Sequence, residues 1–176
     1  MPSNPNPKSN PKPIPNSKVY TTGAGGNGRL GHGQEESCTL PKLIKSLDEA
    51  GIVIQQVAAG GNHIAAIDWD GKCYSWGYNL SGQLGHGHQE IIFNPLLIKS
   101  ISDIVMEQVG AGESHTAFCS SKGEVYTCGW GVFGGHGSTA NVTRPTLVKV
   151  MKPNTNPNPN PTLVKAMIKN RYLNEA

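Results

Sequence analysis

Six histidines and four cysteines are the residues of this sequence best suited to bind a metal or carry a reaction. His32, His86 and His136 each stand in a Gly-His-Gly segment, while His63 and His115 share a second context. Zinc needs about four ligands that converge within tetrahedral reach, whereas repeated positions lie about one structural unit apart. We therefore expect no metal site, and we expect each imidazole to tie a loop by hydrogen bonds.

Three of the cysteines stand at apolar positions of a repeated pattern. Cys73, Cys119 and Cys128 replace Val, Ile and Trp of other copies, so their thiols should pack as small hydrophobes. Unpaired cysteines are typical of reducing compartments. The sequence shows no apolar run of about 20 residues for a membrane span and no apolar core of a signal peptide. We expect a cytoplasmic or nuclear protein.

A glycine pattern that starts at Gly23 has the Gly-x-Gly-x-x-Gly spacing of a dinucleotide-binding loop. Gly23 and Gly28 recur in the other copies, but Gly25 is replaced by Asn79, and no helix or ribose-binding acid is evident downstream. We interpret the repeated glycines as turn residues that supply a positive φ. No cofactor is expected. The predicted turn glycines are Gly23, Gly28, Gly77, Gly82, Gly85, Gly129 and Gly134.

The aromatic residues are better candidates for function. Trp69 lies between Asp68 and Asp70 at a predicted hairpin tip, and tryptophan is enriched in the residues that dominate protein interfaces. Tyr78 and Trp130 occupy one repeat position just after a turn glycine. These five residues are the candidate partner-binding set, and packing of the two tryptophans on neighbouring loops is the alternative. The spacing suggests no Ser-His-Asp or Cys-His pair, so we predict no catalytic residue and no enzyme.

The elements that must position these residues come from a motif that occurs three times. The copies read VYTTGAGGNGRLGHG from Val19, CYSWGYNLSGQLGHG from Cys73 and VYTCGWGVFGGHG from Val125, with the shared tyrosines 54 and 52 residues apart. A period near 50 indicates a repeat architecture, and X-Gly hairpin tips between short apolar runs favour β-strands. We predict an all-β fold, a partial β-propeller. The third copy lacks two residues, which we align with Gln83 and Leu84.

Composition divides the chain into three parts. Residues 1–17 are a predicted disordered Pro/Asn-rich tail, residues 18–150 hold the repeats, and residues 151–176 are a predicted Pro/Asn linker with a short basic tail. Residues 19–137 carry six basic and eleven acidic side chains. A nucleic-acid surface needs clustered Lys and Arg, so the repeat body carries no strong nucleic-acid or membrane signal.

The turn sequence from Gly77 to Gly87 resembles the regulator of chromosome condensation repeat. The resemblance extends to the preceding VAAGGNH segment from Val57 and to the Asp-Gly tip between them. The resemblance covers about residues 18–150. It implies a seven-bladed β-propeller of four-stranded blades, of which this chain holds about two and a half repeats. The founding member of the family is an exchange factor for the small GTPase Ran, and relatives use the propeller as an adaptor.

We therefore predict a non-enzymatic protein-protein interaction module or scaffold. The alternative is a guanine-nucleotide exchange factor, or a fragment of one, for a Ran-like small GTPase, and its only support is the resemblance. Fewer than three blades cannot close a ring of seven, so blade faces should stay exposed. The expected partners are a protein, such as a small GTPase, and either a second copy or missing blades from another chain.

Overall fold

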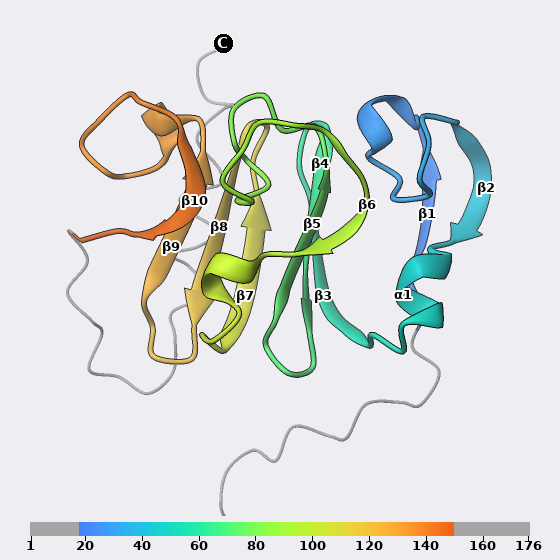
Figure 1. Ribbon diagram of the computed structural model, residues 1–176, viewed down its shortest axis with the longest axis horizontal. Helices are drawn as coiled ribbons and strands as arrows, with labels where there is room; N and C mark the ends of the chain where they lie inside the picture. The colour runs from blue at the N-terminus through green and yellow to red at the C-terminus, as the bar shows by residue number, and fades with distance from the viewer. Residues whose placement is uncertain (1–17, 150–176) are drawn as a thin grey trace, which may run out of the picture.

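The computed structural model describes residues 18–149, which form three antiparallel sheets side by side (Figure 1). The predicted tails, residues 1–17 and 151–176, lie outside the described residues. The first sheet has two strands, β1 (Tyr20–Gly23) and β2 (Cys38–Leu43), and we call it the half-blade. The other two sheets have four strands each. The all-β fold and the four-stranded blades are therefore confirmed.

The two four-stranded sheets repeat the same order of strands. The first blade has β3 (Ile54–Ala59), β4 (His63–Asp68), β5 (Cys73–Gly77) and β6 (Ile92–Leu97); the second has β7 (Met106–Ala111), β8 (His115–Ser120), β9 (Val125–Gly129) and β10 (Val142–Leu147). Short helices connect them: η1 (Gly26–Gly28), α1 (Lys45–Glu49), η2 (Lys99–Ile101) and η3 (Gly131–Phe133). The register also repeats, since His63 pairs with Gly77 and His115 with Gly129.

The sequence repeat and the blade are out of phase. Each copy of the tyrosine motif begins at the third strand of a blade, at β1, β5 or β9, so one blade joins the end of one repeat to the start of the next. The third motif copy, although shorter than the others, belongs to a complete blade, because β9 and β10 are the last two strands of the second blade. The half-blade corresponds to β5 and β6, the outer strands of a full blade.

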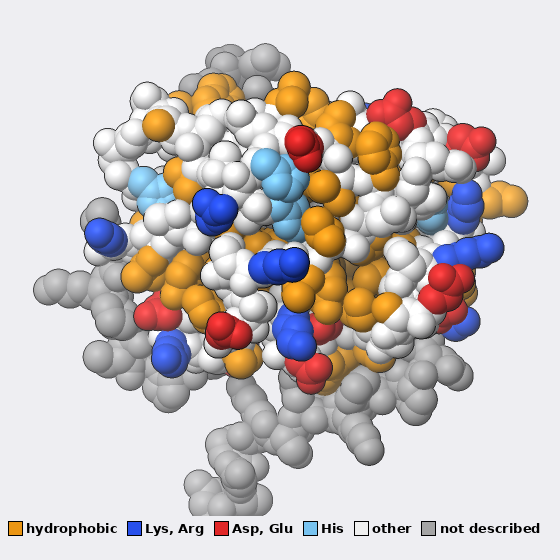
Figure 2. All heavy atoms as spheres, in the orientation of Figure 1, with side chains coloured by type: hydrophobic (Ala, Val, Ile, Leu, Met, Phe, Trp, Pro, Cys, Tyr) orange, Lys and Arg blue, Asp and Glu red, His pale blue; other side chains and the backbone are white. Residues whose placement is uncertain are grey.

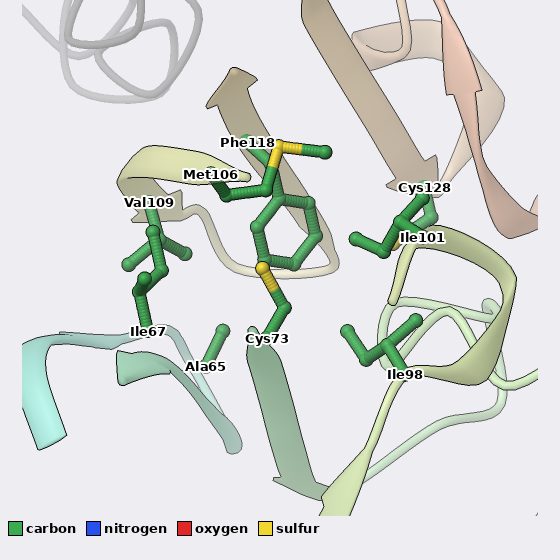
Figure 3. Close-up of a cluster of buried hydrophobic side chains, with 9 residues drawn as sticks. All are labelled: Ala65, Ile67, Cys73, Ile98, Ile101, Met106, Val109, Phe118 and Cys128. Atoms are coloured by element: carbon green, nitrogen blue, oxygen red, sulfur yellow. The ribbon is translucent and has the colours of Figure 1, made fainter. Parts of the chain in front are cut away.

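A hydrophobic cluster joins the two full blades (Figure 3). The Phe118 ring lies at its centre, with Met106 and Val109 beside it and Cys73 of the first blade pointing towards it. Burial raises the pKa of the Cys73 thiol, and it raises that of Cys128 to about 12. The remaining members are Ala65, Ile67, Ile98 and Ile101. The predicted packing of these thiols as hydrophobes is confirmed.

A second cluster holds the half-blade against the first blade. Trp76 and Ile44 are both fully buried in it, and Leu47 of α1 covers one side. The Trp76 indole Nε1 donates to the carbonyl of Arg29, 3.2 Å away, in the loop that follows β1. Neighbouring blades therefore share side chains, as stacked repeats must in order to bury an apolar face.

Candidate functional site

Each glycine-rich loop is tied to a strand by one hydroxyl and one imidazole. In the first blade, Ser75 Oγ donates to the Leu84 carbonyl at 2.7 Å and lies 2.9 Å from His86 Nε2. The other two sheets use a threonine in the same way. Thr21 Oγ1 donates to the Leu30 carbonyl and lies beside His32 Nε2. Thr127 Oγ1 donates to the Gly134 carbonyl and lies beside His136 Nε2. The predicted structural role of these three histidines is confirmed.

The hydroxyl geometry determines the tautomer of His86. Because Ser75 gives its one proton to Leu84, the Nε2 of His86 must carry a proton and donate it to Ser75. Burial lowers the pKa of His86 to about 4, and it also lowers that of His32. These imidazoles are neutral near pH 7, so they hold loops in place and carry no charge to a ligand.

A second histidine connects the two blades across 53 residues. His63 Nε2 lies 2.9 Å from Thr116 Oγ1, which donates to the Gln83 carbonyl at 2.7 Å. Burial, with the nearby His115, lowers the pKa of His63 to about 4. This chain of bonds joins β4, β8 and the glycine-rich loop of the first blade, so the boundary between blades depends on a neutral imidazole.

The predicted turn glycines follow the repeat with one exception. Six of them have a positive φ: Gly23 (111°), Gly28 (68°), Gly77 (105°), Gly82 (79°), Gly85 (79°) and Gly129 (107°). The glycine-rich loops of the half-blade and the first blade pack on the next sheet, and a Cβ on Gly82 would lie 2.8 Å from Thr143 Cα. The turns thus permit both the backbone conformation and the close approach of two blades.

The exception is Gly134. With the two missing residues at Gln83 and Leu84, the sequence aligns Gly134 with Gly82, and this alignment is wrong. Gly134 accepts the Thr127 hydroxyl as Leu84 accepts that of Ser75, so Gly134 stands in the place of Leu84. Its φ is −73°, and the glycine with positive φ is Gly135. The two missing residues therefore come from the first half of the loop, before the Leu84 position. The hydroxyl contact sets this alignment, and glycine spacing alone could not show it.

The five candidate contact residues divide between opposite ends of the blades (Figure 1). We call the end with the β4–β5 and β8–β9 turns the hairpin end; it lies at the bottom of Figure 1. The end with the glycine-rich loops we call the loop end. Asp68, Trp69 and Asp70 lie at the hairpin end, and Tyr78 and Trp130 lie at the loop end.

At the hairpin end, Asp68 builds the turn itself. Its Oδ1 accepts from the backbone N–H groups of Asp70 and Lys72, both at 2.9 Å, and its Oδ2 accepts from the Tyr74 hydroxyl. With these bonds Asp68 is 6% exposed, so its carboxylate is committed to the hairpin. Trp69 is half-buried and Asp70 is exposed, which leaves these two as candidate contacts.

At the loop end, the two aromatic residues hold equivalent places. The Tyr78 N–H donates to the Asn62 carbonyl, and the Trp130 N–H donates to that of Ser114. Tyr78 is half-buried, whereas Trp130 is 38% exposed and meets the Phe133 ring edge to face at 5.1 Å. Phe133 thus supports the Trp130 ring in an exposed position.

Sequence reasoning missed two apolar side chains of the same loops. Leu80 and Val132 are 56% and 55% exposed, and both follow a candidate aromatic residue by two positions. Their signal was available, because each lies in the variable part of the turn where no strand can bury it. Hydrophobic side chains gather along the upper edge of the molecule, over these loops (Figure 2).

Two further features of the described residues concern metal binding and membrane crossing. Within residues 18–149, no group of three or more His, Cys, Asp or Glu side chains is placed to hold a metal ion. The helices of that same part of the chain are too short to cross a lipid bilayer.

Comparison with known proteins places this architecture. The family described as regulator of chromosome condensation (RCC1) repeat matches residues 16–67 and 70–119, and a second model of that description matches residues 54–83 and 107–134. The human E3 ubiquitin-protein ligase HERC2 is 37% identical over 137 residues, which are 77% of this chain and 3% of the ligase. The ultraviolet-B receptor UVR8 of Arabidopsis thaliana is 41% identical over 120 residues, 68% of this chain and 27% of the receptor.

A solved structure shares the fold. Prp20p from Saccharomyces cerevisiae, a protein studied for its binding properties to Gsp1p and histones, aligns with a TM-score of 0.63 and 26% identity over 77% of this chain and 35% of Prp20p. The chain therefore spans about a third or less of these relatives. Since the repeat matches cover more than half of its residues and the blades have the matching order of strands, the chain belongs to the regulator of chromosome condensation (RCC1) repeat family.

Proposed function

We propose that this chain is a non-enzymatic protein-interaction module that binds a partner protein through its loop end. The observation that carries the proposal is the exposure of Leu80, Trp130 and Val132 on neighbouring glycine-rich loops. Large apolar side chains held outward by a rigid sheet are typical of protein interfaces. The ties from Ser75 and Thr127 hold the loops in one conformation, which lowers the entropy lost on binding.

The proposal includes a reducing compartment, the cytoplasm or the nucleus. Cys38, Cys73, Cys119 and Cys128 are all free thiols, three of them buried. Free thiols persist where the thiol pool is kept reduced. A secreted protein with this cysteine usage would be exposed to oxidation at Cys38, the one thiol that is partly accessible.

The first test compares the two ends of the blades. We expect Trp130→Ala to weaken capture of partner proteins at least about tenfold, because truncation of an exposed aromatic anchor removes most of its contact energy. Trp69→Ala, at the hairpin end, is the matched variant and should leave capture unchanged. The measurement is quantitative affinity capture from a cell extract, with thermal unfolding of each variant as the control for folding.

The opposite pattern of losses would place the binding surface at the hairpin end instead of the loop end. If Trp69→Ala abolished capture while Trp130→Ala had no effect, the hairpin end would be the binding surface. Identical sets of captured proteins for wild type and both variants would contradict an interface at either end. A large loss of stability in Trp69→Ala would mean that its indole serves the core.

The second candidate function is nucleotide exchange on a Ran-like GTPase. The similarity to Prp20p, studied for its binding to Gsp1p, supports it. The test is release of fluorescent GDP from purified Gsp1p in the presence of excess chain. We expect no acceleration over the spontaneous rate, and a clear acceleration would replace the non-enzymatic proposal.

A further inference from the structure

A pocket of about 490 Å³ lies between the two full blades, on the outer wall of the molecule. Three segments line it: the β5–β6 loop, the end of β6 with η2, and Arg144 of β10. Figure 2 shows histidine side chains on this face with Lys and Arg side chains beside them. The pocket uses none of the residues proposed above for the loop-end interface.

The pocket carries two positive charges without an ion-pair partner among residues 18–149. Lys99 and Arg144 both line it and both are exposed. Among residues 18–149, the ion pair made by a Lys or Arg side chain is Lys18 with Asp48. Glu90 Oε2 lies 3.9 Å from His88 Nδ1, a pair that would exist only with a protonated ring, and no acid of these residues pairs with Lys99 or Arg144.

The position of Arg144 differs from what the repeat supplies elsewhere. Its guanidinium lies against the backbone at Gly87, where a Cβ added to Gly87 would be 2.6 Å from the Cζ of Arg144. At the boundary between the half-blade and the first blade, the corresponding contact is Asn94 against Gly33, where a Cβ on Gly33 would lie 3.4 Å from Asn94 Oδ1. The same scaffold therefore carries a neutral amide at one boundary and a cation at the other.

The rest of the pocket adds a hydrogen-bond donor and an apolar wall. His88 Nδ1 accepts from the Glu90 N–H at 3.2 Å, which leaves Nε2 as the nitrogen of the ring that can donate. The His88 ring stacks on that of His86 at a centroid distance of 5.9 Å. Leu96, which is 41% exposed, and Leu97 form the apolar part of the lining.

We propose that this pocket binds an acidic peptide segment of a partner protein. A carboxylate of the segment is held by Arg144 and Lys99, since charged donors form the strongest hydrogen bonds to carboxylates. An aliphatic side chain next to it packs on Leu96. A polyphosphate chain fits less well, because it has no apolar side chain to pack on Leu96 and Leu97.

The experiment measures binding of a labelled peptide by fluorescence anisotropy. The probe is a seven-residue peptide, Gly-Leu-Glu-Asp-Leu-Glu-Gly, and its control carries Gln and Asn in place of the acids. We expect saturable binding of the acidic peptide alone, and about tenfold weaker binding for Arg144→Asn and for Lys99→Gln, the loss of one charged hydrogen bond. Lys45→Gln changes the equivalent lysine of the first boundary and should leave affinity within about twofold.

Other results would overturn the proposal. They are no saturable binding at about 1 mM peptide, equal binding of the Gln/Asn peptide, affinity unchanged by Arg144→Asn and Lys99→Gln together, or displacement of the peptide by a short oligonucleotide at about 0.15 M salt. Both variants change exposed side chains, and thermal unfolding checks their folding. Trp130→Ala should bind the peptide normally, so failure of the loop-end interface and failure of this pocket are distinguishable.

Discussion

At the scale of single residues, neutral imidazoles hold the blades together. His63 is 1% exposed, and its Nε2 is hydrogen-bonded to the Thr116 hydroxyl, which donates its own proton to the Gln83 carbonyl. A proton on the buried ring would place a charge where little water can solvate it, which is why burial is the main cause of the lowered pKa. The same argument applies to His86 in its loop.

This predicts stability that falls on acidification. The pKa of His63 is about 4 in the folded chain, against 6.5 for an unperturbed histidine. The unfolded chain therefore binds more protons between these two pH values. Stability is therefore complete above about pH 6.5 and is lost as pH falls towards 4, on the order of 3 kcal/mol for one such histidine. Urea unfolding at a series of pH values measures it.

A matched variant isolates the contribution of His63. His63→Gln should lower stability at neutral pH and flatten the dependence below pH 6.5, with a residual slope from His86, whose pKa is also about 4. If the variant kept the slope of the wild type, the acid sensitivity would belong to other groups. His32, at a half-buried loop position, supplies the comparison with a smaller expected effect.

At the scale of elements, the glycine-rich loop is the part that joins one blade to the next. The Gly87 N–H donates to the Thr143 carbonyl at 2.8 Å, and the Gly33 N–H donates to that of Phe93 at 3.0 Å. Each loop thus reaches the outer strand of the following blade. A loop that approaches a strand so closely has no room for a Cβ on the glycines that face the strand, Gly28 against Phe93 and Gly82 against Thr143.

We predict that Gly82→Val is far more damaging than Gly123→Val. Both glycines have a φ near +79°, which costs a residue with a Cβ about 1–2 kcal/mol. At Gly82 the Cβ would also lie 2.8 Å from Thr143 Cα, adding about 1–3 kcal/mol of overlap. At Gly123 no described atom lies within 4 Å. Equal melting temperatures would contradict the packing argument.

At the scale of the whole molecule, the described chain leaves one blade face uncovered. Val57 of β3 is 56% exposed, whereas its counterpart Val109 in β7 is 9% exposed because β7 packs against β3 and β4. Residues 18–149 contain only the outer strands of the half-blade, so the inner pair that would cover Val57 is not among them. We propose that a second copy, or blades of another chain, covers this face.

The measurement is absolute mass by light scattering over a range of concentrations. We expect a discrete oligomer for the wild type and a shift to monomer for Val57→Lys, because a charge on an apolar interface is costly to bury. Val132→Lys, which changes an equally exposed side chain at the loop end, should leave the mass unchanged. A monomer at every concentration would rule out self-association and favour blades from another chain.

The sequence by itself determined the local features of this protein. Strand spacing, six of the seven predicted positive-φ glycines, and the apolar places of Cys73, Cys119 and Trp76 follow from short-range periodicity and are present in the structure. Local pattern is sufficient for them because a turn or a strand depends on residues that are neighbours in the chain. The family followed from the same motifs.

The tertiary structure decided everything that depends on contact between blades. It placed Trp69 and Trp130 at opposite ends, joined His63 to Thr116, and set Arg144 against Gly87. The physical reason is distance along the chain: these contacts join residues of different repeats or strands, and repeat spacing alone does not show which residues meet when blades stack.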